Sequence, residues 1–175
     1  MGGCDSARCR LGWGGNGVSK VARVRAVGSY LLQTEDNPEG VPQATFDQMS
    51  AGMKADRAHF FRGFFKDFFG VGLVSHPVSA EVIEWARATS MQAGLKATLA
   101  CAKAFATTDF RPDLAAFKVP TLIIHGTDDK TVPIDASARK AVQGIAGAHL
   151  IEYEGAPHGL FATHKERLIA DVMAF

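Results

Sequence analysis

Residues 119–133 constrain the fold and the chemistry of this chain more than any other stretch. They read Val-Pro-Thr-Leu-Ile-Ile-His-Gly-Thr-Asp-Asp-Lys-Thr-Val-Pro. The first half is apolar on both faces, which is typical of a strand buried inside a parallel sheet. The second half passes through Gly126 and places two carboxylates in a turn. Because open α/β sheets carry their chemistry on loops at the C-terminal ends of strands, the stretch predicts an α/β fold with a site at this loop.

A second polar loop follows one helix and one strand later. The pattern predicts a helix over residues 136–145 and a strand over 149–153, and the sequence then reads Glu-Gly-Ala-Pro-His158-Gly. Strand, helix, strand and loop in this order are typical of the crossover of a parallel sheet. We therefore expect the two loops to emerge at the same edge of the sheet.

A carboxylate and a histidine on neighbouring loops are two members of a nucleophile-histidine-acid triad. A histidine that acts as a general base needs an acceptor on its second ring nitrogen, usually a carboxylate. His158 is the candidate base and Asp129 the candidate acid, with Asp128 as a rival for the acid. We interpret His125 as the end of a strand and His164 as a first-turn residue of the last helix.

Bulk properties restrict the class of protein. With 175 residues the chain can form one cored domain or part of a larger α/β domain. Its net charge of +1 gives no argument for a nucleic-acid or membrane-surface partner. No apolar run approaches the roughly 20 residues of a membrane span, and no signal peptide is visible. Three cysteines without zinc spacing favour a reduced, cytoplasmic setting and predict no metal site.

The N-terminal residues 1–19 are rich in glycine and irregular in pattern. Residues 12–17 satisfy the G-x-G-x-x-G pattern, and Glu35 follows at the distance of a ribose-binding acid. However, no strand precedes this segment, and residues 18–28 look like a strand where a dinucleotide site requires a helix. We interpret residues 1–19 as an irregular loop and predict no cofactor.

The middle of the chain divides into one strand and a helical block. Val21–Ser29 is a predicted strand in which alternating arginines suggest one less buried face. Residues 41–107 are predicted to form a helical cap on a domain spanning residues 20–175. Its aromatic residues recur at helical spacing, which favours core over pocket lining, although part of this wide stripe could line an apolar pocket. They are Phe60, Phe61, Phe64, Phe65, Phe68 and Phe69.

Helix signals mark several expected boundaries. Ser79 is predicted to cap one helix, and another is expected over residues 91–105. Residues 163–166 read Thr-His-Lys-Glu, a capping box for a final helix that ends at Phe175.

Two loops of the sequence resemble motifs of a known family. Residues 125–133 resemble the H-G-x-x-D-x-x-V-P acid loop of α/β-hydrolases, and residues 156–159 resemble their catalytic histidine loop. Residues 104–114 and the turn at 37–42 are similar to the aryl-esterase and cofactor-free haloperoxidase branch. The resemblance covers about residues 18–175.

The resemblance implies roles for particular residues. Asp129 would be the triad acid and His158 the base, acting with a serine on a small-molecule ester or acid without metal or haem. In some family members a peracid forms and oxidises halides. Residues implied to face the acyl or alcohol pocket are Met49, Phe64, Phe68, Thr131 and Val132.

The sequence departs from the family pattern at its start. The family's nucleophile elbow reads G-x-S-x-G-G-G, and residues 1–5 resemble the part immediately after that serine. Met1 would then hold the oxyanion-hole position, and the serine is expected just before it. Cys4 has the spacing of a substitute nucleophile but no strand before it. No other serine fits the elbow pattern: neither Ser29 nor Ser6, Ser50, Ser75, Ser90 and Ser137.

Two hypotheses follow. The first is that this chain is the C-terminal part of an α/β-hydrolase that cleaves carboxylic esters, and that it is inactive without the serine. The second is a non-catalytic fragment or interaction protein built on an incomplete hydrolase fold, in which an exposed sheet edge favours partner binding. Whether the protein forms a homo-oligomer is left open.

Overall fold

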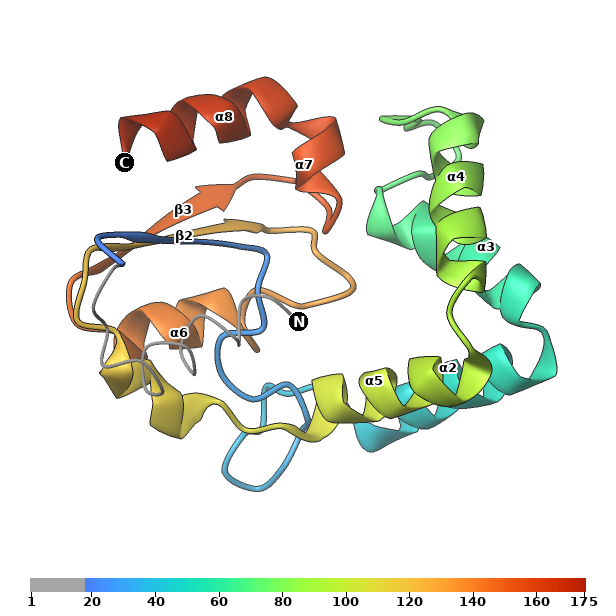
Figure 1. The fold of residues 1–175 in the computed structure, drawn as a ribbon, viewed down its shortest axis with the longest axis horizontal. Coiled ribbons are helices and arrows are strands. Elements are labelled where there is room, and N and C mark those ends of the chain that lie inside the picture. The colour runs from blue at the N-terminus through green and yellow to red at the C-terminus, as the bar shows by residue number, and fades with distance from the viewer. Residues whose placement is uncertain (1–17) are drawn as a thin grey trace.

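A three-stranded parallel sheet lies at the centre of the fold. The computed structural model describes residues 18–175, and the predictions for Met1, Cys4 and residues 12–17 lie outside this range. Within it, β1 (Val21–Val24), β2 (Thr121–Gly126) and β3 (Ala148–Tyr153) pair in parallel in the order β1-β2-β3 (Figure 1). Every residue of the central strand β2 is buried. The predicted α/β fold with a parallel sheet is therefore confirmed.

Helices cover both faces of this sheet. Figure 1 shows α6 (Ala138–Gly144) on one face and α8 (Lys165–Ala174) on the other. Successive side chains of a strand point to opposite faces. Accordingly, Ile123 packs in one cluster with α6 and the short 3₁₀ helix η1 (Arg111–Ala116), whereas Leu122 and Ile124 pack in another with α7 (Leu160–Thr163) and α8. This two-sided burial explains why the β2 sequence is apolar throughout.

Four helices form a block beside the sheet, within the range predicted as a cap. They are α2 (Gln43–Ala55), α3 (Arg57–Phe68), α4 (Ala80–Met91) and α5 (Leu95–Thr107) (Figure 1). The α3 helix contacts α2 and α4, and its buried residues Phe61 and Phe65 join Met53 and Phe69 in one cluster. No helix within residues 18–175 is both long and apolar enough for a membrane span.

The first strand is shorter than predicted. It ends at Val24 because Arg25 has a φ of 47°, a left-handed conformation that no strand residue adopts. The predicted less buried face is wrong for Arg23, which is 4% exposed. Its guanidinium lies over the Phe117 ring at 5.2 Å and donates a hydrogen bond to the Val27 carbonyl at 3.1 Å. The aliphatic part of Arg23 can therefore lie in the core, because the Phe117 ring and the Val27 carbonyl hold its guanidinium.

The three predicted helix boundaries have different outcomes. The Ser79 cap is confirmed, because its hydroxyl accepts a hydrogen bond from the Val82 N–H. The capping box at 163–166 is wrong: Thr163 Oγ1 instead bonds with His164 Nδ1, and α8 begins without a side-chain cap. The helix predicted over 91–105 begins only at Leu95, because the Gly94 backbone is extended there.

Candidate active site

Asp129 lies in a tight loop immediately after β2. Its Oδ1 accepts hydrogen bonds from the backbone N–H groups of Thr131 at 2.9 Å and Val132 at 2.7 Å. These bonds fold the carboxylate inward, and Asp129 is only 4% exposed. Asp128, the rival acid, is exposed. The local turn chemistry therefore selects Asp129 as the carboxylate that faces the interior.

His158 meets Asp129 from the loop after β3. The distance between His158 Nδ1 and Asp129 Oδ2 is 2.6 Å, and His158 is 7% exposed. Because a carboxylate accepts, the hydrogen must be on Nδ1 when the ring is neutral. The lone pair is then on Nε2, the nitrogen on the opposite side of the ring. This is the arrangement of a histidine poised to take a proton at Nε2.

Close backbone packing holds the two loops together. The Thr127 N–H donates to the Tyr153 carbonyl at 3.0 Å, and the Asp128 N–H donates to the Ala156 carbonyl at 3.2 Å. Gly126 makes this approach possible, because a Cβ built on it would lie 2.1 Å from the Ala156 oxygen. The glycine at the end of β2 is therefore required by the neighbouring loop rather than by its own backbone angles.

The cap reaches the histidine loop through the end of α3. The Gly159 N–H donates to the Phe68 carbonyl at 2.6 Å, and the rings of Phe68 and His158 meet edge to face with centroids 4.8 Å apart. The Arg25 guanidinium lies over two rings, 5.6 Å from the centroid of Phe68 and 4.5 Å from the centroid of Phe161. The His158 ring is thus held by a hydrogen bond to Asp129 and by its contact with the Phe68 ring.

Burial and hydrogen bonding set the charges of the pair. Burial by itself raises the pKa of Asp129, but hydrogen bonds from His125 and His158 outweigh it and lower that pKa to about 2. Burial lowers the pKa of His158 below its ordinary value, and the Asp129 charge only partly opposes this. Near neutral pH the pair is therefore an ionised carboxylate beside a neutral imidazole, the state a general base requires.

The titration of His158 follows from these shifts. A base with a lowered pKa keeps its neutral, active form until the pH falls through that lowered value. We expect the ¹⁵N NMR titration midpoint of His158 to lie below the ordinary histidine value of about 6.5. A midpoint at or above that value would contradict the burial argument. The experiment needs no catalytic activity.

His125 was not expected at the site. It is the last residue but one of β2 and is fully buried, and its Nε2 lies 3.1 Å from Asp129 Oδ2 and 2.8 Å from the Val132 carbonyl oxygen. From the sequence, His125 was interpreted only as the end of a strand. A signal was present in its spacing, because His125 and Asp129 flank the turn four residues apart.

An apolar cavity of about 370 Å³ is lined by residues of α2, α3 and the acid loop. Lys130 and Thr131 of the acid loop line one part of it. Its apolar lining comes mainly from the cap and consists of Val41, Phe46, Met49, Phe60, Phe64 and Phe105. The cavity is large enough for a small organic substrate and is close to the catalytic candidates.

The residues implied to face a pocket are divided among three places. Met49, Phe64 and Thr131 line the 370 Å³ cavity. Phe68 contacts the His158 ring, and Val132 is 1% exposed in a core cluster with Val27, Leu31 and Ala136. The structure therefore brings four of the five to the cavity or the histidine and places Val132 in the core.

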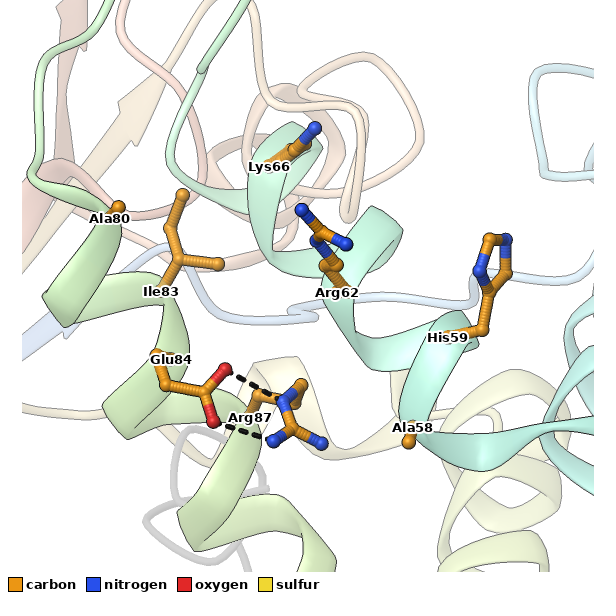
Figure 2. Close-up of a pocket in the computed structure, with 8 residues that line it drawn as sticks. All are labelled: Ala58, His59, Arg62, Lys66, Ala80, Ile83, Glu84 and Arg87. Carbon is orange, nitrogen blue, oxygen red and sulfur yellow. Dashed lines mark hydrogen bonds and ion pairs between the residues drawn. The ribbon is translucent and has the colours of Figure 1, made fainter.

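A second cavity of about 500 Å³ lies between α3 and α4 (Figure 2). Its lining includes three basic side chains, Arg62, Lys66 and Arg87, and Arg87 pairs with Glu84 at 2.5 Å. It shares only His59 with the smaller cavity and includes no residue of the acid or histidine loop. We therefore do not assign it to the active site. Among residues 18–175, no cluster of three or more histidine, cysteine or acidic side chains could hold a metal ion.

Comparisons with known proteins bear on the family and the fold of this chain. No protein-family model matches the chain. It is 37% identical over 159 residues to a non-haem chloroperoxidase of Streptomyces lividans, covering 90% of this chain and 58% of that protein. It is 36% identical over 163 residues to a bifunctional esterase/perhydrolase of Acinetobacter calcoaceticus, covering 90% of this chain and 58% of the relative.

A solved structure matches the fold closely. The bromoperoxidase of Bacillus anthracis superposes with a TM-score of 0.94 and 37% identity, covering 99% of this chain and 63% of that one. The chain thus spans less than two thirds of the length of each of these three proteins.

Proposed function

Because the chain belongs to the α/β-hydrolase superfamily, in its branch of non-haem haloperoxidases and esterases, we propose that it supplies the acid and the base of a serine esterase. The observation that carries this proposal is the buried 2.6 Å contact between Asp129 and His158 at the C-terminal edge of the sheet. In the complete reaction Asp129 orients His158, and His158 takes the proton of a serine that attacks the ester carbonyl.

The nucleophile is proposed to lie outside the described residues. Within residues 18–175 no serine or cysteine hydrogen bonds to His158, whose hydrogen-bond partner there is Asp129. We propose that the serine belongs to a Gly-x-Ser elbow that precedes Met1 in the intact protein, so that the 175-residue chain alone does not turn over esters. Met1 would then donate its backbone N–H to the oxyanion.

The reaction steps follow from the geometry of the imidazole. His158 Nε2 accepts the serine proton as the C–O bond to the carbonyl carbon forms, and Nδ1–H remains bonded to the Asp129 carboxylate. The imidazolium then gives that proton to the departing alkoxide, and the acyl group remains bonded to the serine. Water, deprotonated by the same Nε2, then attacks the acyl carbon. The bond from that carbon to the serine oxygen breaks, the imidazolium returns its proton to the serine, and the acid is released.

Perhydrolysis is the second reaction that we propose, on the strength of the esterase/perhydrolase relative. If hydrogen peroxide replaces water at the acyl-serine, the product is a peracid, and the serine regains its proton. No metal or haem takes part in this step. When an acetate ester is supplied together with peroxide, the amounts of peracid and of free acid that form measure how the acyl group is divided between the two acceptors.

The named relatives favour an enzyme over the alternative of a non-catalytic interaction protein. Turnover of p-nitrophenyl acetate tests the choice. It is measured for the 175-residue chain and for the chain extended by the reading frame upstream of Met1. We expect turnover in the extended protein only. Turnover by the chain alone would overturn the placement of the serine, and no turnover in either form would overturn the esterase proposal.

The aromatic cavity is proposed to hold the acyl group. Replacing Phe64 with alanine enlarges the cavity, because Phe64 lines it. We expect the ratio of kcat/KM for p-nitrophenyl octanoate over butyrate to rise about 10-fold, since a pocket discriminates by the methylenes it can bury. Trp85→Ala is the control, because Trp85 is 70% exposed and lies outside this cavity. An unchanged ratio in Phe64→Ala would place the acyl group elsewhere.

A further inference from the structure

His125 is a buried histidine that the proposed triad does not use. Its side chain is fully buried at the end of β2. Nε2 lies 2.8 Å from the Val132 carbonyl oxygen and 3.1 Å from Asp129 Oδ2. Nδ1 is buried and has no hydrogen-bond partner among the described residues. A fully buried imidazole with one ring nitrogen left without a partner has an energetic cost that calls for an explanation.

The two oxygens around Nε2 fix where the hydrogen is. A backbone carbonyl and an ionised carboxylate can only accept hydrogen bonds, so Nε2 must carry the hydrogen. This single N–H is shared between Val132 and Asp129, and the lone pair of the neutral ring is on Nδ1. The tautomer of His125 is therefore opposite to that of His158, in which Nδ1 carries the hydrogen.

Two imidazole N–H groups consequently converge on one oxygen. Asp129 Oδ2 faces His158 Nδ1 at 2.6 Å and His125 Nε2 at 3.1 Å, while Oδ1 accepts two backbone N–H groups. The carboxylate is surrounded by four donors and has no freedom to rotate. The negative charge of Asp129 Oδ2 therefore interacts with the His125 ring as well as with the His158 ring.

We propose that His125 is a positioning residue that fixes the Asp129 carboxylate and limits how strongly this carboxylate holds His158. The proposal rests on the proposed function, in which His158 is the general base. Its physical basis is that His125 and His158 compete for the same oxygen, Asp129 Oδ2. A hydrogen bond from one ring weakens the attraction of this oxygen for the other ring. His125 also links Asp129 to the Val132 carbonyl, so the shape of the acid loop and the orientation of its acid are set together.

Other charged groups near the two rings act differently. Arg25, the residue after β1, opposes protonation of His158 through its positive charge, and its guanidinium is stacked on aromatic rings. Glu152 on β3 lies opposite His125 in the sheet register, but its carboxylate is paired with Arg139 at 2.6 Å. Asp129 is therefore the acidic group that couples His125 to His158.

Removing the second donor should make His158 more basic. In His125→Leu the full charge of Oδ2 is available to the imidazolium form of His158, so its ¹⁵N NMR titration midpoint should move upward by roughly half a pH unit or more. His125→Gln is the rescue variant, because its amide N–H can reach the position of Nε2. We expect its midpoint to stay within about 0.2 of the unsubstituted protein, a small fraction of the shift that a lost donor produces.

Two outcomes would overturn the proposal. If His125 only supports the fold, both variants lower thermal stability and leave the His158 midpoint unchanged. Should His125→Leu fail to fold, the ¹⁵N shifts of the unsubstituted protein decide, because they show which ring nitrogen of His125 carries the hydrogen. A protonated Nδ1 in the neutral ring contradicts the shared-donor geometry.

These measurements separate this proposal from the proposed function. None of them requires ester turnover. An upward shift in His125→Leu together with no esterase activity would support the coupling of the two rings and overturn only the assignment of the reaction. Turnover with an unchanged midpoint would support the esterase and overturn the role of His125.

Discussion

Replacing Asp129 with asparagine is expected to lower kcat/KM for p-nitrophenyl acetate about 10⁴-fold in the active form of the protein. All four groups around the carboxylate are donors: two imidazole N–H groups and the backbone N–H groups of Thr131 and Val132. An asparagine has one accepting oxygen, so its NH₂ group must face at least one of these donors. His158 then loses its orientation, its correct tautomer, or both.

Asp128→Asn is the matched control for this prediction. Asp128 precedes Asp129 and is exposed, so the same loss of charge on the same loop should change kcat/KM by less than about 3-fold. Circular dichroism of both variants shows whether the fold is kept. If Asp128→Asn loses the activity and Asp129→Asn keeps it, the acid has been assigned to the wrong member of the pair.

The second large effect is expected on stability, from Gly126→Ala. The added Cβ would lie 2.1 Å from the Ala156 oxygen and 2.7 Å from the Ala156 carbonyl carbon, and backbone atoms cannot move aside as a flexible side chain does. The histidine loop must therefore move away from β2. We expect a loss of about 3 kcal/mol, which corresponds to a fall in Tm of roughly 6–12 °C by thermal unfolding.

Gly63→Ala provides a control with the opposite sign. Gly63 lies inside α3, and a Cβ built there meets no atom within 4 Å. Alanine is favoured over glycine in a helix interior by about 1 kcal/mol, so this variant should raise Tm by a few degrees. An equal or higher Tm for Gly126→Ala than for the unsubstituted protein would show that the two loops are not packed as described.

The sequence was sufficient to predict the parallel sheet and the meeting of the two loops. The apolar run of β2 follows directly from burial on both faces, and parallel strands joined by a crossover bring their C-terminal ends to one edge. The choice between Asp128 and Asp129 stayed open from the residues alone. The choice depends on which carboxylate accepts hydrogen bonds from the backbone N–H groups of the turn. The backbone angles of the turn decide this, and the sequence does not specify them.

Contacts between distant segments could not be predicted in the same way. The family resemblance implied that Phe68 faces a pocket. Helical spacing alone, which six phenylalanines share, does not distinguish the ring that reaches His158 from the rings that fill the core. The early end of β1 depends on the left-handed backbone of Arg25, which its residue type does not favour. The role of His125 depends on a turn that brings its ring back to Asp129.

The most direct test of the central claim is the rate at which a fluorophosphonate probe labels the active form of the protein. If His158 activates the nucleophile, labelling occurs at one serine, and His158→Ala slows it at least about 100-fold. His149→Ala, which changes an exposed histidine of β3, leaves the rate unchanged. Labelling of His158→Ala at the unsubstituted rate would contradict the assignment of His158 as the base.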